Sequence, residues 1–137
     1  MNKQQIKLVK DSFVLVQPIQ AVAADLFYER LFQLDPWLRP YFRGDMAAQK
    51  QKLMTALAFV VAGLDRPDTL LPHIQAMGVR HAGYGVQPEH YDTVGAALLW
   101  TLGQRLGEQF TPAVAAAWAA AYDLLASTMR AAAEPAG

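Results

Sequence analysis

The segment LLPHIQAMGVRHAGYG, residues 70–85, sets the fold expected for this chain. Three apolar residues and one histidine recur in it at the spacing of one helix face: Leu70, Ile74, Met77 and His81. Gly83 and Gly85 then end the predicted helix. An imidazole is therefore expected on the buried face of a helix. A histidine on an apolar face is more often a structural residue than a ligand, so residues elsewhere must decide between the two.

Helical periodicity continues on both sides of this segment, and no stretch alternates apolar and polar residues as a strand would. The first predicted helix has an apolar face over 6–16 and is ended or redirected by Pro18, and a second helix runs over about 18–34. Asp35-Pro36 then opens a short helical segment that Pro40 and Gly44 close, and a helix over about 46–64 follows. After the helix that carries His81, one helix begins at Pro88 and the last begins at Thr111-Pro112. We predict an all-α fold of about six to eight helices in a single domain, 1–137, whose alanine-rich tail, 131–137, frays.

The composition excludes several classes of function. Hydrophobic residues make up 53% of the 137 residues and charged residues 18%, which is typical of a packed globular protein. Twelve basic residues balance twelve acidic ones without a basic run, so nucleic acid and anionic membranes are not expected partners. Because the chain has no cysteine, disulfides, thiol catalysis, thiolate metal sites and thioether-linked cofactors are excluded. Without a signal peptide or a membrane-spanning segment, we expect a cytoplasmic protein.

Residues upstream of His81 complete a candidate pocket for haem. Such a pocket needs a basic nitrogen on one side of the iron, apolar walls, and hydrogen-bond donors over an open coordination position. Gln49 and Leu53 lie four residues apart, so an amide donor and an apolar wall share one helix face. Tyr28 adds a phenol donor from the preceding helix. Lys52, on the flank of the same face, is either a partner for a haem propionate at the pocket mouth or an ordinary solvated lysine.

At this point the sequence resembles the globin family, most closely the single-domain bacterial haemoglobins and the globin domain of flavohaemoglobins. The resemblance covers nearly the whole chain and depends on an ordered set of residues rather than on one motif. The set is Phe27-Tyr28, Asp35-Pro36, Tyr41-Phe42, Gln49 with Leu53, His81, the stretch Pro88-Glu89-His90-Tyr91, and Trp118 with Tyr122.

The resemblance implies a role for each site residue. His81 is the proximal ligand of a non-covalent haem b, Phe42 stacks on the haem, and Tyr28 and Gln49 form the distal pair that stabilises a bound gas. The implied haem contacts are Phe42, Leu53, Lys52, Met77, His81, Val86, Tyr91 and Val94. In the bacterial family a proximal tyrosine, here Tyr91, helps to hold the histidine and a glutamate in one hydrogen-bonded group. The match falters there, because Glu134 is displaced from the expected spacing after Trp118.

Other side chains are assigned ordinary structural roles. His73 and His90 are interpreted as exposed or helix-start residues, because neither forms a metal-ligand spacing with His81. Phe42 and Tyr28, taken alone, would be interpreted as core aromatic residues. Their places in the ordered set favour the haem-contact and distal-donor roles instead.

The resemblance implies a haem globin that binds dioxygen, nitric oxide and carbon monoxide at ferrous iron. Its use would be either oxygen binding and delivery, or nitric oxide dioxygenation to nitrate. Sustained dioxygenation needs a separate electron donor, because the sequence has no glycine-rich dinucleotide loop. The alternative is a haem-free, globin-like sensor or interaction module. Peroxidase chemistry is disfavoured, since the distal side offers no His/Arg acid-base pair.

Overall fold

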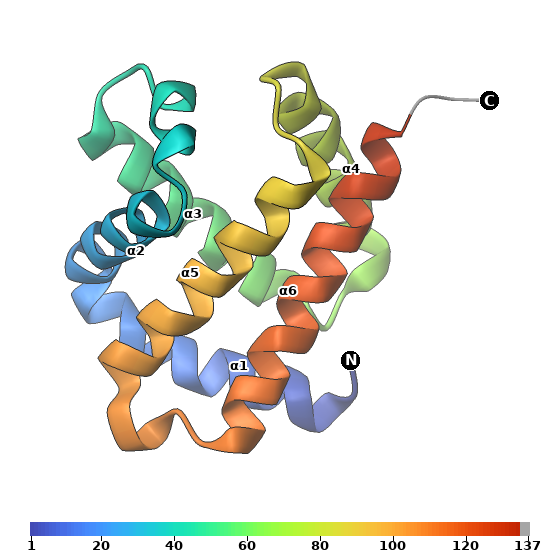
Figure 1. Ribbon diagram of the computed structural model, residues 1–137. Helices are drawn as coiled ribbons and strands as arrows, with labels where there is room; N and C mark the ends of the chain where they lie inside the picture. The colour runs from blue at the N-terminus through green and yellow to red at the C-terminus, as the bar shows by residue number, and fades with distance from the viewer. Residues whose placement is uncertain (135–137) are drawn as a thin grey trace.

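A computed structural model of the protein describes residues 1–134, and within this range every regular element is a helix (Figure 1). The elements are α1 (Lys3–Val16), η1 (Gln17–Ile19), α2 (Gln20–Leu34), η2 (Pro36–Tyr41), α3 (Met46–Gly63), α4 (Pro67–Gly83), α5 (Pro88–Leu106), η3 (Gly107–Gln109) and α6 (Pro112–Ala133), where η denotes a short 3₁₀ helix. The predicted all-α fold is confirmed.

Side chains at the helix ends explain where several of these elements begin. The Asp35 carboxylate accepts a hydrogen bond from the Trp37 amide at 3.1 Å and starts η2. Thr111 caps α6 by accepting from the Val114 amide at 3.2 Å. Pro18 lies in the 3₁₀ turn between α1 and α2, as predicted, because proline cannot supply the amide that would continue α1 as an α-helix.

The end of α4 also follows the prediction. The helix stops at Gly83, and Gly85 adopts a φ of +90°, a left-handed conformation that favours glycine. The amide of Val86 then donates to the His81 carbonyl at 3.1 Å. This turn satisfies a backbone acceptor that the helix end would otherwise leave free.

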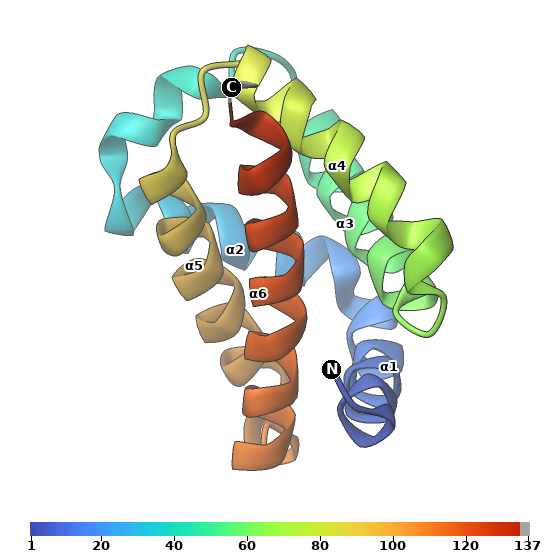
Figure 2. The same ribbon diagram turned by 90° about the vertical axis from the view of Figure 1, so that its right-hand side faces the viewer.

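Helix α6 is the centre of the fold. Its most extensive contacts are with α4 and α1, while α2 packs mainly against α5. Figure 2 shows α4 and α6 converging at the upper end of the view, where α4 ends. The core between the helices is built from the apolar faces predicted from the sequence, including Val9, Phe13, Leu70, Ile74, Leu98 and Trp118.

The tail of the chain differs from the prediction in part. We expected fraying from Ala131, but α6 continues to Ala133 because Ala132 and Ala133 remain half-buried. Alanine also has the best helix propensity. The rest of that prediction, for 135–137, lies outside the described residues. Among residues 1–134, no helix is long and apolar enough to cross a membrane.

One buried hydrogen bond joins the two ends of the sequence. The Trp118 indole Nε1 donates to Ser12 Oγ at 2.8 Å, and Ser12 Oγ in turn donates to the Leu8 carbonyl at 2.7 Å. Both side chains are buried. A buried N–H group without an acceptor is unfavourable, so this pair fixes how α1 packs on α6.

We predict that Ser12→Ala lowers the free energy of unfolding by about 1–3 kcal/mol, because it leaves the buried indole N–H without an acceptor. Urea unfolding followed by circular dichroism measures the loss. Ser127→Ala is the matched control, since the exposed Ser127 hydroxyl bonds only to carbonyls of its own helix. The control should change the value by no more than about 0.5 kcal/mol. Equal losses in both variants would contradict a bridging role for Ser12.

Candidate functional site

The predicted polar pair is joined directly. Gln49 Nε2 on α3 donates to Tyr28 Oη on α2 at 3.2 Å. Only 4% of Tyr28 is exposed, and burial raises the pKa of its phenol above the ordinary value. The phenol therefore keeps its proton at neutral pH. Because its oxygen already accepts from Gln49, the Tyr28 O–H remains available to donate to a third group.

An aromatic cluster holds Tyr28 in place. Its ring packs edge-on against Phe27 and Phe42, with centroid distances of 5.0 and 5.4 Å. Phe42 also packs edge-on against Phe32, at 5.5 Å. Edge-to-face contacts of this kind orient rings as well as burying them. Phe42 is half-buried and lies directly after the end of η2. These contacts therefore hold its ring beside the phenol ring of Tyr28.

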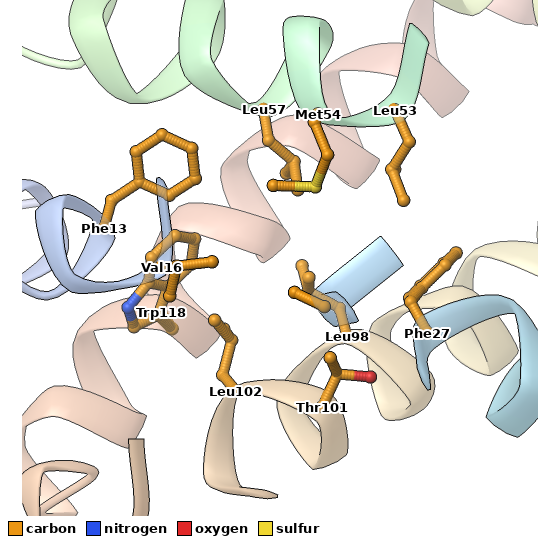
Figure 3. Close-up of a pocket in the computed structure, with 11 residues that line it drawn as sticks. Phe13, Val16, Phe27, Leu53, Met54, Leu57, Leu98, Thr101, Leu102 and Trp118 are labelled. Atoms are coloured by element: carbon orange, nitrogen blue, oxygen red, sulfur yellow. The ribbon is translucent and has the colours of Figure 1, made fainter. Parts of the chain in front are cut away.

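Leu53 forms part of a small apolar cavity. The cavity has a volume of about 20 Å³, and Figure 3 shows Leu53, Met54 and Leu57 of α3 facing Leu98 and Leu102 of α5 across it. Phe13, Val16, Ala23, Phe27, Thr101 and Trp118 complete the lining. The Thr101 hydroxyl is satisfied by the Ala97 carbonyl at 2.8 Å, so the walls offer no free polar group. Leu53 is thus an apolar wall residue one helical turn after Gln49.

His81 lies half-buried near the end of α4, with one ring nitrogen already committed. Nδ1 lies 2.7 Å from the Met77 carbonyl oxygen, and since a carbonyl can only accept, Nδ1 carries the proton. In a neutral imidazole the lone pair is then on Nε2. Backbone hydrogen bonding of this kind fixes the tautomer and orientation of ligand histidines. His81 is therefore prepared to ligate through Nε2.

The other residues that were predicted to contact the haem differ in how far they are buried. Met77, Val86 and Val94 are half-buried and pack against the core. Lys52 is exposed and lines an open groove on α3 together with Ala48, Gln51, Thr55, Ala56 and Phe59. Its ammonium group is therefore positioned at the surface rather than beside Gln49.

Tyr91 is buried, and its neighbours differ from the group that the resemblance implies. The Tyr122 hydroxyl donates to the Tyr91 backbone carbonyl at 2.5 Å, and the Arg130 guanidinium lies 5.8 Å from the Tyr91 ring centroid. Burial raises the pKa of both tyrosines, so both remain protonated at neutral pH. Glu134 is exposed beyond α6. The charged side chain that α6 places over the Tyr91 ring is thus the Arg130 cation rather than the Glu134 carboxylate.

The two other histidines have structural partners. His90 Nδ1 accepts a hydrogen bond from the Gln87 amide at 2.9 Å at the start of α5, as a helix-start residue would. His73 is exposed and packs edge-on against Phe59. Among residues 1–134 no group of three or more histidine, aspartate or glutamate side chains could hold a metal ion. Of the three histidines, His81 is the one whose Nδ1 lies against a backbone carbonyl.

The sequence did not reveal which residues set the position of α4. Gly78 is buried in the middle of α4, and a Cβ there would lie 2.3 Å from the Met129 carbonyl oxygen. Glycine inside a helix lowers the free energy of unfolding by about 1 kcal/mol relative to alanine. A glycine inside the predicted helix, one position after Met77, was therefore the sequence signal for a close packing contact at this point. The cavity residues gave no signal beyond ordinary apolar periodicity.

Fold and site together define the class of this protein: an all-α domain with the fold of the bacterial globins. The chain superimposes on a globin of Campylobacter jejuni with a TM-score of 0.84 over 96% of both chains, at 24% identity. An engineered carbene transferase from Rhodothermus marinus, named as a candidate nitric oxide dioxygenase, gives a TM-score of 0.86 at 29% identity and covers 97% of this chain and 93% of that one. The globin family model matches residues 25–129. The chain belongs to the globin family.

Curated relatives agree with this assignment. The flavohemoprotein of Rhodopirellula baltica is 30% identical over 129 residues, and that of Bacillus subtilis is 32% identical over 131 residues. Each alignment covers 92% of this chain and 32% of the relative. The chain thus spans about a third of the length of these relatives.

Proposed function

We propose that this protein binds haem b without a covalent link, through His81 Nε2, and that the haem binds dioxygen, nitric oxide and carbon monoxide. The observation that carries the proposal is the Nδ1 hydrogen bond from His81 to the Met77 carbonyl, which leaves Nε2 free as a ligand. The donor set fits haem, which takes one protein nitrogen, better than a free metal ion, which takes three or four protein ligands. Haem would supply an iron centre with an open coordination position.

The apolar residues provide the walls for the cofactor. Phe42, Leu53, Met77, Val86 and Val94 are the side chains that we assign to haem contact, and each packs against the apolar core. Lys52 shares its groove with neither Gln49 nor Leu53, so the predicted contact with a propionate is not part of this proposal. Apolar walls on both sides would exclude water from the gas-binding position.

Tyr28 and Gln49 are the residues that we assign to gas stabilisation. A diatomic ligand that gains negative charge on binding is stabilised by a donor already oriented toward it. The Gln49 amide donates to Tyr28 Oη, which orients the phenol and leaves its proton for the ligand. Tyr28 is thus the direct donor and Gln49 the group that orients and polarises it.

Two uses of gas binding are consistent with the relatives. One is oxygen binding and delivery, and the other is nitric oxide dioxygenation, in which dioxygen and nitric oxide form nitrate and the iron is left oxidised. The flavohemoproteins and the Rhodothermus marinus relative favour the second use. We assign the return of an electron to a donor outside these 137 residues, which contain no glycine-rich dinucleotide loop.

An optical spectrum of the purified protein tests the proposal. We expect a Soret band, five-coordinate ferrous iron after reduction, and separate spectral changes under dioxygen and then nitric oxide. Protein that takes up no haem on reconstitution would contradict the proposal and favour a haem-free globin-like module.

A single-turnover experiment tests the dioxygenase use. The oxygenated protein should convert about one equivalent of nitric oxide to nitrate and then stop with oxidised iron, because the 137 residues contain no glycine-rich dinucleotide loop to deliver a second electron. Adding NADH alone should not restart the reaction, whereas NADH with an added flavin reductase should. Sustained consumption with NADH alone, in protein shown to be free of flavoenzyme, would contradict the need for a donor. Slow or absent nitrate formation would favour oxygen delivery instead.

A further inference from the structure

We propose that Gly78 is a positioning residue for His81: direct contact between Gly78 and the Met129 backbone of α6 fixes the distance at which α4 presents its histidine to the iron. This inference rests on the proposed role of His81 as the iron ligand. It adds a contact between two helix backbones, outside the pocket, that sets the strength of the iron–histidine bond.

The first observation is how closely the two helices approach. A Cβ at position 78 would lie 2.3 Å from the Met129 carbonyl oxygen, 2.6 Å from its Cα and 2.8 Å from its carbonyl carbon. All three atoms belong to the backbone, and none can move by a change of rotamer. The contact between α4 and α6 is also the most extensive between helices in the described residues. Figure 2 shows this junction at the upper end of α6.

The second observation is how directly this contact is connected to the imidazole. Gly78 follows Met77, whose carbonyl oxygen holds His81 Nδ1 at 2.7 Å. Gly78 also lies three residues before His81, one turn below it on the helix. A displacement of the backbone at Gly78 therefore moves the group that orients the ring and the helix turn that carries it.

The size of the effect follows from the geometry. Ordinary contact begins at 3.4 Å, so a methyl group at position 78 must separate the helices locally by about 1 Å. The turn that carries and orients the imidazole moves with the displaced backbone, so we expect Gly78→Ala to lower the iron–histidine stretching frequency of the ferrous protein. Haem loss should become about tenfold faster, which corresponds to about 1.4 kcal/mol of lost binding free energy.

Two matched controls separate positioning from general destabilisation. Gly83→Ala is on the same helix, but a Cβ there has nothing within 4 Å, so the stretching frequency should not change. Ser12→Ala lowers stability through the Trp118 indole, at a hydrogen bond that involves neither α4 nor any side chain assigned to the haem, so it should keep the frequency. Resonance Raman spectra and thermal unfolding curves are recorded for all three variants. Equal frequency shifts in Gly78→Ala and Ser12→Ala would overturn the inference.

A ligand that is not tethered to α4 gives the sharpest test. In a His81→Gly protein reconstituted with free imidazole, adding Gly78→Ala should leave the iron–imidazole frequency unchanged, because the ligand no longer moves with the helix. A shift there as large as in the histidine-ligated protein would overturn the inference. If instead His81→Gly alone leaves the spectrum unaltered, the ligand assignment has failed rather than the role of Gly78.

A second variant covers the case in which Gly78→Ala does not fold. Met129→Ala removes the Met129 side chain but keeps the backbone atoms that contact Gly78. We expect it to lower stability, since Met129 is buried, and to keep the iron–histidine frequency. A shifted frequency in folded Met129→Ala would mean that side-chain packing, rather than the Gly78 contact, positions α4.

Discussion

His81→Gly is expected to abolish stable haem binding, and free imidazole is expected to restore the native spectrum. The substitution removes the proposed ligand nitrogen and leaves a space the size of the lost ring at the end of α4. Imidazole can enter that space and offer an unprotonated nitrogen to the iron. Titration of the Soret band with imidazole, after reconstitution with haem, measures both the loss and the rescue.

His73→Gly is the matched control for this substitution. It places the same residue in the same helix, where it costs about 1 kcal/mol of helix stability, but His73 is exposed and packs against Phe59. Its Soret band should match that of the unsubstituted protein. If His81→Gly keeps the native spectrum without imidazole, His81 is not the ligand, and His90 becomes the next candidate despite its bond to the Gln87 amide.

The fold could be predicted from the sequence because each helix carries its own signals. Asp35-Pro36 and Thr111-Pro112 mark the starts of η2 and α6 through a capping side chain and a first-turn proline, and both form as predicted. Gly83 and Gly85 mark the end of α4, which also forms as predicted. These signals depend on residues a few positions apart, so local chemistry is enough to identify them.

The arrangement of the helices is less accessible from sequence. Gly78 and Met129 lie 51 positions apart, and only the packing of α4 on α6 brings their backbones together. The Ser12 to Trp118 hydrogen bond joins residues 106 positions apart for the same reason. The apolar residues around the small cavity follow normal helical periodicity, so nothing in their pattern distinguishes a void from a filled core.

The polar pair illustrates what sequence can supply and what geometry adds. Tyr28 and Gln49 were predicted to face one pocket, but their spacing did not say whether the tyrosine would point at a ligand or at the glutamine. The structure gives Gln49 Nε2 as the donor and Tyr28 Oη as the acceptor. That direction makes the phenol proton the one available to a bound gas, and it determines the order of effects expected from substitution.

Tyr28→Phe is accordingly expected to speed dioxygen release by about ten- to a hundredfold. A hydrogen bond to a partly charged acceptor contributes about 1.5–3 kcal/mol, and about 1.4 kcal/mol corresponds to a tenfold change in rate. Carbon monoxide release should change less, because carbon monoxide gains less negative charge on binding. Stopped-flow release kinetics for both gases measure the two effects. Tyr41→Phe is the control and should leave both rates unchanged, since Tyr41 is exposed and its ring packs against His90 rather than against Gln49.

A double-mutant cycle shows whether Gln49 acts through Tyr28. If its only role is to orient the phenol, Gln49→Leu should speed dioxygen release in the native background but have no effect in the Tyr28→Phe background. Independent effects that add in the double variant would mean that Gln49 donates to the gas itself.

Equal changes for dioxygen and carbon monoxide in Tyr28→Phe would contradict a donor role for the phenol. The phenol would then shape the pocket without donating to the ligand, because only a hydrogen bond responds to the charge that distinguishes the two gases.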